Sequence, residues 1–277
     1  MATVNFGRRE ILCKVVYYGP GLCGKTTNLQ AIHAKVPDKM RGNLTSVATQ
    51  QDRTLFFDLL PIEIGKIRDF SVRMQLYTVP GQVYYNASRR IVLKGVDGIV
   101  FVADSQHGKM EENIESLENL RENLEANNIN PANVPIVLQY NKRDLSPVYS
   151  VEELNQALNP NNLAHFESVA TTGQGVFNTL KGVTALVVQD IKQKLEAADT
   201  GATKPKPKPA AAQPKPSADP AQQPAEAPKP QEKPAPAPMQ HDDTPMTETQ
   251  ELAEPDSEAA RSGFWKKVST LFGSKGK

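Results

Sequence analysis

Three stretches of the chain are almost continuously apolar, and each of them is short. They are residues 11–18, 98–104 and 134–140. Runs of this length and composition are typical of strands whose two faces are both buried, as in a parallel sheet that is covered by helices. The pattern therefore predicts three central strands.

Two further stretches, residues 54–61 and 70–79, are also strand-like. The second alternates apolar and polar side chains, and the apolar ones that share a face are Val72, Met74 and Leu76. With residues 62–69 as the connection, the two stretches can form an antiparallel pair at the edge of a parallel sheet.

Amphipathic stretches separate these strands. Residues 25–35, 110–124 and 176–195 carry apolar side chains three or four positions apart, which predicts helices with one buried face. The side chains that we expect to face inward are Leu29, Ile32, Ile114, Leu117, Leu120, Leu124, Phe177, Leu180, Val183, Val187 and Ile191. Alternating strands and helices predict an α/β fold with a doubly wound, mostly parallel sheet and one antiparallel edge pair. Such a sheet binds its ligand at the carboxyl ends of the strands.

Proline divides the chain into parts. Of its 22 prolines, eight precede residue 200 and 14 lie between residues 201 and 260. Residues 1–197 are therefore the predicted globular domain. Residues 198–260, rich in Pro, Ala, Lys and Gln, cannot bury enough apolar surface to offset the entropy of ordering. We expect a disordered linker there. The alternative, which makes a more specific prediction, is a linker with docking sites for polyproline-binding domains.

The last part of the chain, residues 261–277, is a candidate amphipathic helix. On a helix its apolar side chains share one face, and they are Phe264, Trp265, Val268, Leu271 and Phe272. The segment also holds five basic residues and no acidic one. Three interpretations remain open: a helix on an anionic membrane surface, a helix in the groove of a partner protein, and a disordered end.

Charge and cysteine content narrow the class of protein. The formal net charge is +1, which gives no electrostatic reason to expect a nucleic-acid partner. Cys13 and Cys23 are too few for a disulfide scaffold. Residues 1–10 lack the apolar core of a signal peptide, and the chain has no long apolar run, so we expect a cytoplasmic protein. The four histidines are widely separated and show no metal-ligand spacing.

Residues 19–26 read GPGLCGKT and directly follow the first apolar run. They fit Gly-x-x-x-x-Gly-Lys-Thr, in which glycines let successive N–H groups face one centre and the next helix adds its positive dipole end. An accidental glycine turn is the alternative, and the strand before and helix after argue against it. Lys25 would reach the β- and γ-phosphates, and the Thr26 hydroxyl would bind Mg²⁺. The predicted nucleotide contacts are Gly19, Gly21, Leu22, Cys23, Gly24, Lys25, Thr26 and Thr27.

A second motif, Asn141-Lys142-Arg143-Asp144, follows at the end of the third apolar run and bears on which base the nucleotide carries. The Asp144 carboxylate can accept from guanine N1–H and the exocyclic amine together, a pair that adenine lacks. Asn141 can brace the other edge of the ring or the phosphate loop. Alone, such residues are as well explained by a polar turn after a strand. About 120 residues after a phosphate loop, they favour GTP over ATP.

With both motifs in place, the sequence resembles the Ras-like small GTPases of the P-loop class, and especially the bacterial gliding-motility and cell-polarity GTPases of the MglA type. The resemblance covers residues 5 to about 195 and rests on strings such as YYGPGLCGKTTNLQ, DRTLFFD, LYTVPGQVYY, QYNKRDL and ATTGQGVFNTLK. It implies a switch that binds GTP or GDP, acts on motility or polarity effectors, and is stimulated by a Roadblock/LC7-type homodimer. We add Ala170 and Thr171, in the last string, to the predicted nucleotide contacts.

One string departs from the common Ras pattern. Most such proteins have Asp-x-x-Gly before the second switch, whereas this chain has Thr78-Val79-Pro80-Gly81. A hydroxyl in place of a charge predicts looser Mg²⁺ binding unless another carboxylate helps, and Asp52 and Asp58 are both candidates. Thr78 and Gly81 stay among the predicted nucleotide contacts. Gln82 follows the glycine, a position suited to orienting the attacking water.

Arg53 and Thr54 end the long polar stretch after the first helix. Thr54 could bind Mg²⁺ and sense the γ-phosphate, and Thr45 and Thr49 are rivals that only the family resemblance disfavours. Arg53 matches the built-in arginine finger of the family, whereas the residues alone explain it equally well as an exposed arginine. The expected function is a slow GTPase whose partner aligns Arg53 and Gln82. A nucleotide-loaded scaffold with little turnover is the alternative, because of Thr78.

Overall fold

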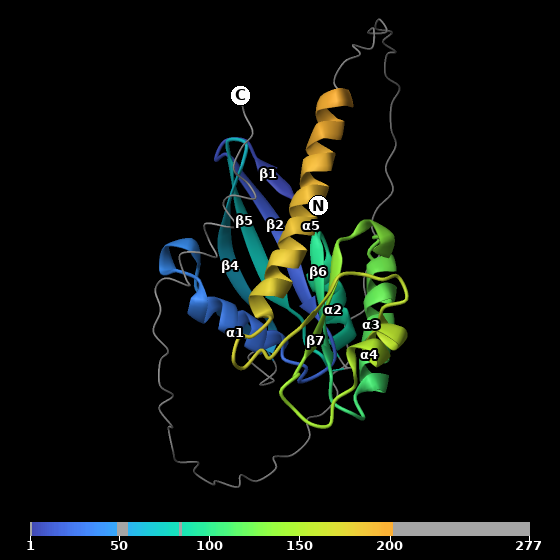
Figure 1. The fold of residues 1–277 in the computed structure, drawn as a ribbon. Helices are drawn as coiled ribbons and strands as arrows, with labels where there is room; N and C mark the ends of the chain where they lie inside the picture. The colour runs from blue at the N-terminus through green and yellow to red at the C-terminus, as the bar shows by residue number, and fades with distance from the viewer. Residues whose placement is uncertain (1, 49–54, 83–84, 202–277) are drawn as a thin grey trace, which may run out of the picture. The chain divides into compact units, whose positions relative to one another are not determined.

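The computed structural model describes residues 2–48, 55–82 and 85–201 (Figure 1). Arg53 and Thr54 lie outside the described residues, as do the rival candidates Asp52 and Thr49. Residues 202–260 of the predicted linker (198–260) and the terminal segment 261–277 also lie outside them and stay predictions.

Within the described ranges, eight strands form one sheet in the order β3-β4-β5-β2-β6-β7-β8, with β1 paired to β2. The strands are β1 (Thr3–Asn5), β2 (Glu10–Tyr18), β3 (Thr45–Ala48), β4 (Leu55–Ile67), β5 (Phe70–Thr78), β6 (Gly98–Asp104), β7 (Ile136–Asn141) and β8 (His165–Glu167). The α-helices are α1 (Lys25–Lys35), α2 (Asn86–Leu93), α3 (Met110–Glu125), α4 (Val151–Leu158) and α5 (Val176–Gly201), and short 3-10 helices cover Asp38–Met40 and Pro131–Asn133.

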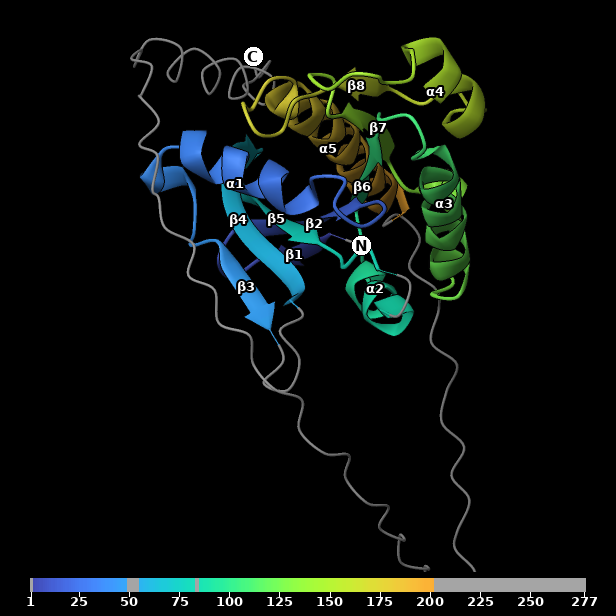
Figure 2. The ribbon, with the colours of Figure 1, turned by 90° about the horizontal axis from the view of Figure 1, so that it is seen from below.

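The centre of the sheet is parallel. β5, β2, β6, β7 and β8 run in one direction, because β2 pairs in parallel with both β5 and β6, and β6, β7 and β8 continue the same pattern. At one edge β4 is antiparallel to β5, and β3 is antiparallel to β4 (Figure 2). The three apolar runs are thus central strands, as predicted, and all residues of β6 are buried.

Alternation along β2 divides the core into two layers. Ile11, Val15 and Tyr17 join the core cluster that contains Leu29 of α1 and Val183 of α5. The other face of the strand, with Val16 and Tyr18, joins the cluster built with side chains of α2, α3 and α4. Helices therefore cover both faces of the sheet, which confirms the doubly wound α/β fold.

The observed edge of the sheet is larger than the pattern predicts. β4 does not end at Pro61 but continues to Ile67, and Arg68, at φ 52°, turns the chain into β5. The prediction of a connection over residues 62–69 was therefore wrong, since residues 62–67 continue β4 and the turn is shorter. β3 lies in the long polar stretch after the first helix, where no strand was predicted, and α5 continues beyond residue 195.

No helix within the described residues is long and apolar enough to cross a membrane.

Candidate nucleotide site

The phosphate loop, Thr78 and Asn141 lie at the carboxyl ends of the central strands. β2 ends at Tyr18, the phosphate loop follows, and α1 begins at Lys25. β5 ends at Thr78 beside it, and β7 ends at Asn141. Because these strands are parallel, their carboxyl ends all lie on the same side of the sheet. The phosphate loop, the Thr78 segment and the guanine motif are therefore neighbours although they are far apart in sequence.

The conformation of the phosphate loop requires two of its glycines. Gly19 has φ 148°, and a Cβ there would lie 2.1 Å from the Val102 carbonyl oxygen. Gly24 has φ 102°, and its Cβ would lie 2.2 Å from Asn141 Nδ2. Both the left-handed backbone and the close approach exclude side chains. By contrast, Gly21 borders open space, and Leu22 is 93% exposed at φ 59°. The loop thus presents its backbone on an open side, as a phosphate cradle must.

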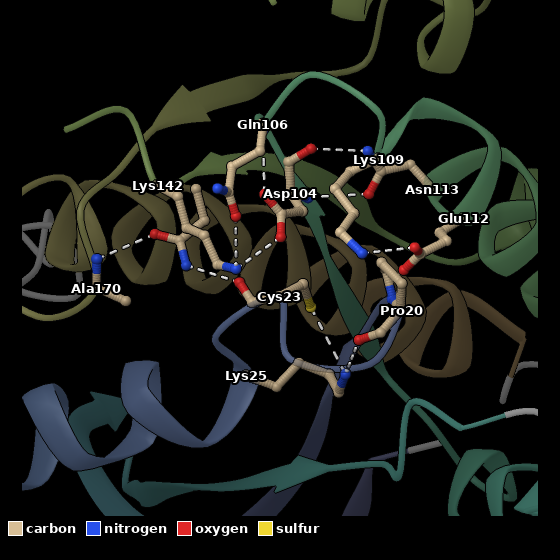
Figure 3. A network of polar contacts seen from close by, with 11 residues as sticks. Pro20, Cys23, Lys25, Asp104, Gln106, Lys109, Glu112, Asn113, Lys142 and Ala170 are labelled. Carbon is tan, nitrogen blue, oxygen red and sulfur yellow. Dashed lines mark hydrogen bonds and ion pairs between the residues drawn. The ribbon is translucent and has the colours of Figure 1, made fainter. Parts of the chain in front are cut away.

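Lys25 lies inside the curve of this loop (Figure 3). Its ammonium is almost fully buried and donates to the carbonyl oxygens of Gly19, at 2.9 Å, and Pro20, at 2.5 Å. A third, weaker contact reaches Cys23 Sγ at 3.6 Å. Burial raises the pKa of the Cys23 thiol although Lys25 opposes the shift, so the thiol stays neutral near pH 7. The charge available to an incoming anion is therefore that of Lys25.

A buried carboxylate lies beside Thr26 and Thr78. Asp58, on β4, is 2% exposed, and its Oδ2 accepts from Thr26 Oγ1 at 2.7 Å and from Thr78 Oγ1 at 2.8 Å. The Asp58 N–H donates back to Thr78 Oγ1 at 2.8 Å, and Ser46 Oγ donates to Asp58 Oδ1 at 2.7 Å. Asp58, one of the two acids that could replace the one missing at position 78, thus lies beside Thr26, and the other, Asp52, lies outside the described residues.

This group of oxygens fits Mg²⁺. A hydroxyl and a carboxylate are hard oxygen donors, and Mg²⁺ is commonly held by one or two such protein ligands together with phosphates and waters. Asp58 was not ranked above Asp52 from sequence, because its closeness to Thr78 depends on how β4 and β5 pair. Leu59 is opposite Tyr77 in that pairing, so their neighbours Asp58 and Thr78 lie together.

The guanine motif is connected to the phosphate loop through Asn141. Its Nδ2 donates to the Cys23 carbonyl oxygen at 2.7 Å, and its Oδ1 accepts from Ser168 Oγ and from the Ala170 N–H, each at 3.0 Å. Asn141 and Ala170 are buried, whereas Thr171 is exposed. One amide thus joins three loops, and the role of Ser168 was missed because nothing in the local sequence marks it.

Lys142 and Asp144 take different places beside this amide. Lys142 has φ 65°, and its ammonium pairs with Asp104 Oδ2 at 2.6 Å and contacts Gln106 Oε1 at 3.2 Å (Figure 3). Asp144 is exposed, and no described residue donates a hydrogen bond to its carboxylate. Its acceptors are free for a ligand, as a guanine-reading acid requires. Asp104 was not predicted as a site residue. Its position as the polar last residue of β6 could have indicated its pairing with Lys142.

The Thr78 segment contacts the phosphate loop directly. A Cβ at Gly81 would lie 2.4 Å from Gly21 N and 2.5 Å from the Pro20 carbonyl oxygen, so only glycine allows this approach. The next side chain, Gln82, is exposed. Gln82 is therefore attached to backbone that touches the loop, while its side-chain amide is exposed to solvent.

A separate hollow of about 1490 Å³ lies among α2, α3 and α5. Its lining includes Asp97 and Pro135, which precede β6 and β7, so it lies at the other ends of these strands. It contains no residue of the phosphate loop or of the guanine motif, and we do not place the nucleotide there.

Comparisons with known proteins agree with this geometry. The profile of the ADP-ribosylation factor family matches residues 5–187 of the chain. A curated relative, the "Mutual gliding-motility protein MglA" of Myxococcus xanthus (strain DK1622), is 56% identical over 193 residues, which are 70% of this chain and 99% of the relative. The relative thus matches over nearly its full length, and the remainder of this chain has no counterpart in it.

Proposed function

The chain belongs to the ADP-ribosylation factor family of small GTPases, and from this premise we propose that it is a GTP-hydrolysing switch in gliding motility or cell polarity. The process is proposed from the relative of Myxococcus xanthus, whose name refers to gliding motility. We further propose that hydrolysis is slow until a Roadblock/LC7-type homodimer stimulates it.

One contact supports the nucleotide assignment above the others. The 2.7 Å hydrogen bond from Asn141 Nδ2 to the Cys23 carbonyl oxygen joins the base-reading motif to the phosphate loop. With the two motifs joined in this way, Asp144 and Lys25 would contact opposite ends of one ligand, a purine nucleotide with its phosphates. Asp144 would accept from guanine, Lys25 would neutralise the β- and γ-phosphates, and the loop amides would donate to their oxygens.

Thr26 and Thr54 are the proposed Mg²⁺ ligands, with Asp58 as the nearby carboxylate. When bound, the ion would neutralise charge on the phosphates. Thr78 would act through Asp58, since its hydroxyl donates to the Asp58 carboxylate and fixes its orientation. In this arrangement the acid of the common pattern is supplied by the neighbouring strand.

For hydrolysis, we assign Gln82 to orient the attacking water and Arg53 to neutralise charge on the transferred phosphoryl group. Arginine fingers supply about 10³- to 10⁵-fold in rate. Arg53→Ala and Gln82→Ala should therefore keep their affinity for GTP and lose the partner-stimulated turnover. Wild-type stimulated rates in either variant would show that the role of that residue is wrong.

A nucleotide-loaded scaffold is the second candidate function, and Thr78 is the observation that favours it. Single-turnover release of phosphate from GTP, with and without a Roadblock/LC7-type partner, separates the two. Release that the partner accelerates supports the switch. GTP that stays bound and intact under both conditions supports the scaffold, and binding of ATP as tight as that of GTP would contradict both.

Residues 261–277 are proposed to dock either on an anionic membrane or in a protein groove. A flexible linker of roughly 60 residues would span about 45 Å, so the segment could act at a distance from the domain. Co-sedimentation with anionic vesicles, comparing the full chain with one ended at Gly201, tests the membrane. Equal pelleting of the two excludes the membrane and leaves the groove or a disordered end.

A further inference from the structure

A buried arginine on α2 holds the backbone on both sides of Gly81. Arg89 is 5% exposed, and its Nη1 donates to the Gln82 carbonyl oxygen at 2.5 Å and approaches that of Pro80 at 3.4 Å. Burying a guanidinium is costly unless its donors find acceptors, and a planar fork holds neighbouring acceptors more rigidly than an ammonium does. Arg89 therefore restrains the segment that carries Gln82.

Arg89 is in turn fixed by a cluster of polar side chains from α3 and β2. Its Nε donates to Asn119 Oδ1 at 3.0 Å, and the same oxygen accepts from Tyr18 Oη at 2.6 Å and Asn123 Nδ2 at 2.9 Å. Asn123 Nδ2 also reaches Asn86 Oδ1, at the start of α2, at 2.7 Å. Tyr18 is the last residue of β2, immediately before the phosphate loop. The cluster thus connects the base of that loop to the Gln82 backbone.

The segment is held from the opposite side as well. Gly81 lies against Pro20 and Gly21 so closely that a Cβ would overlap them. With the phosphate loop on one side and Arg89 on the other, the Gln82 backbone has a defined place, whereas its side chain stays exposed. An arginine at this position is not needed to fill the core, because α2 already buries Val92 and Leu93.

We propose that Arg89 is a positioning residue for GTP hydrolysis, which fixes the Pro80 and Gln82 carbonyls so that the Gln82 side chain starts from a set position beside the phosphate loop. The inference rests on the role proposed for Gln82. A displacement of about 1 Å at a reacting group costs up to about 100-fold in rate, so losing this restraint should slow turnover by roughly 10- to 100-fold. Nucleotide affinity should change less than about threefold, because the acceptors that Arg89 holds, on Pro80, Gln82 and Asn119, belong to neither the phosphate loop nor the guanine motif.

Single-turnover hydrolysis of GTP by the full chain, stimulated by a Roadblock/LC7-type partner, tests this, with GDP affinity measured by calorimetry on the same samples. Arg89→Gln should lose turnover and keep GDP affinity, and Arg89→Lys should recover part of the rate, since an ammonium reaches one carbonyl but not the whole set. Arg90→Gln is the matched control: Arg90 is on the same helix, but it is exposed and donates to the Ala126 carbonyl oxygen. Asn119→Ala, which removes the support of Arg89 and not its charge, should also slow turnover if Arg89→Gln fails to fold.

A double variant distinguishes positioning from a general structural role. If Arg89 acts through Gln82, then Arg89→Gln should cause no further loss of turnover in a Gln82→Ala background. Additive losses, a fall in GDP affinity as large as the fall in turnover, or wild-type turnover in Arg89→Gln would each overturn the inference alone. A wild-type chain that does not hydrolyse GTP, or Gln82→Ala at the wild-type rate, would instead contradict the proposed function on which it rests.

Discussion

Replacing Thr78 by aspartate, the residue that most Ras-like proteins have there, should destabilise this protein. The Thr78 hydroxyl lies 2.8 Å from Asp58 Oδ2 in a buried site, so Thr78→Asp would place two carboxylates side by side. Two like charges about 4 Å apart repel by about 4 kcal/mol at an effective dielectric constant of about 20. If one of the two carboxylates takes up a proton instead, the cost at pH 7 is about the same as this repulsion. An ordinary aspartate has a pKa of about 3.9, and each pH unit above it costs about 1.4 kcal/mol. We therefore expect a loss of up to about 4 kcal/mol.

Urea unfolding followed by circular dichroism, with EDTA and without nucleotide, measures this loss. Thr78→Asn is the matched control, because its neutral amide can still donate to Asp58, and the difference between the two variants isolates the charge. In Thr78→Asp the folded pair binds more protons than the unfolded chain, so stability should fall as pH rises and the difference should shrink toward pH 4. Exchanging the residues, Asp58→Thr with Thr78→Asp, restores one carboxylate and should recover most of the loss. A Thr78→Asp variant as stable as wild type at pH 7 would refute the assignment of Asp58 as the carboxylate of this site.

Three further substitutions test the rest of the site. Gly24→Ala should lower stability by more than about 1 kcal/mol and weaken GDP binding, because φ is 102° and the new Cβ would lie 2.2 Å from Asn141 Nδ2; unchanged calorimetric affinity would contradict the cradle. Asn141→Ala removes buried hydrogen bonds to Cys23, Ser168 and Ala170, so at about 1 kcal/mol each it should cost about 3 kcal/mol and speed GDP release, as stopped-flow fluorescence would detect. Asp144→Asn should reduce the preference for GTP over ATP at least tenfold while changing the free energy of unfolding by under about 0.5 kcal/mol, because the side chain is exposed; an unchanged preference would remove its role in reading the base.

Features encoded by neighbouring residues could be predicted from the sequence. The apolar run of β6 indicated a strand buried on both faces, and all its residues are buried. The glycine spacing of residues 19–26 indicated a phosphate loop, and Gly19 and Gly24 have the backbone angles and close contacts that only glycine accepts. Each of these depends on a few consecutive residues, so the chain carries the signal locally.

Features that depend on strand pairing could not be predicted in the same way. β3 lies at the edge of the sheet and is only four residues long. Its sequence, TSVA, has too little apolar pattern to predict a strand. Pro61 interrupts the pattern of β4 but not the strand itself. Arg89 was not singled out, since no helix was predicted over its stretch and a charged side chain is normally solvated. Its burial follows from the carbonyls of Pro80 and Gln82, which only the fold brings to it.

The same distinction explains the departure at Thr78. Motif comparison examines one strand at a time, and on β5 it finds a hydroxyl where a carboxylate is usual. The antiparallel edge pair places Asp58 of β4 against that hydroxyl and against Thr26, so a carboxyl group lies at this position but on the neighbouring strand. A missing acid in one motif therefore does not imply a weak metal site, because the register of the adjacent strand can supply the charge. The position of β4 relative to β5 then determines whether that carboxylate is available, and so links the edge of the sheet to the chemistry at its centre.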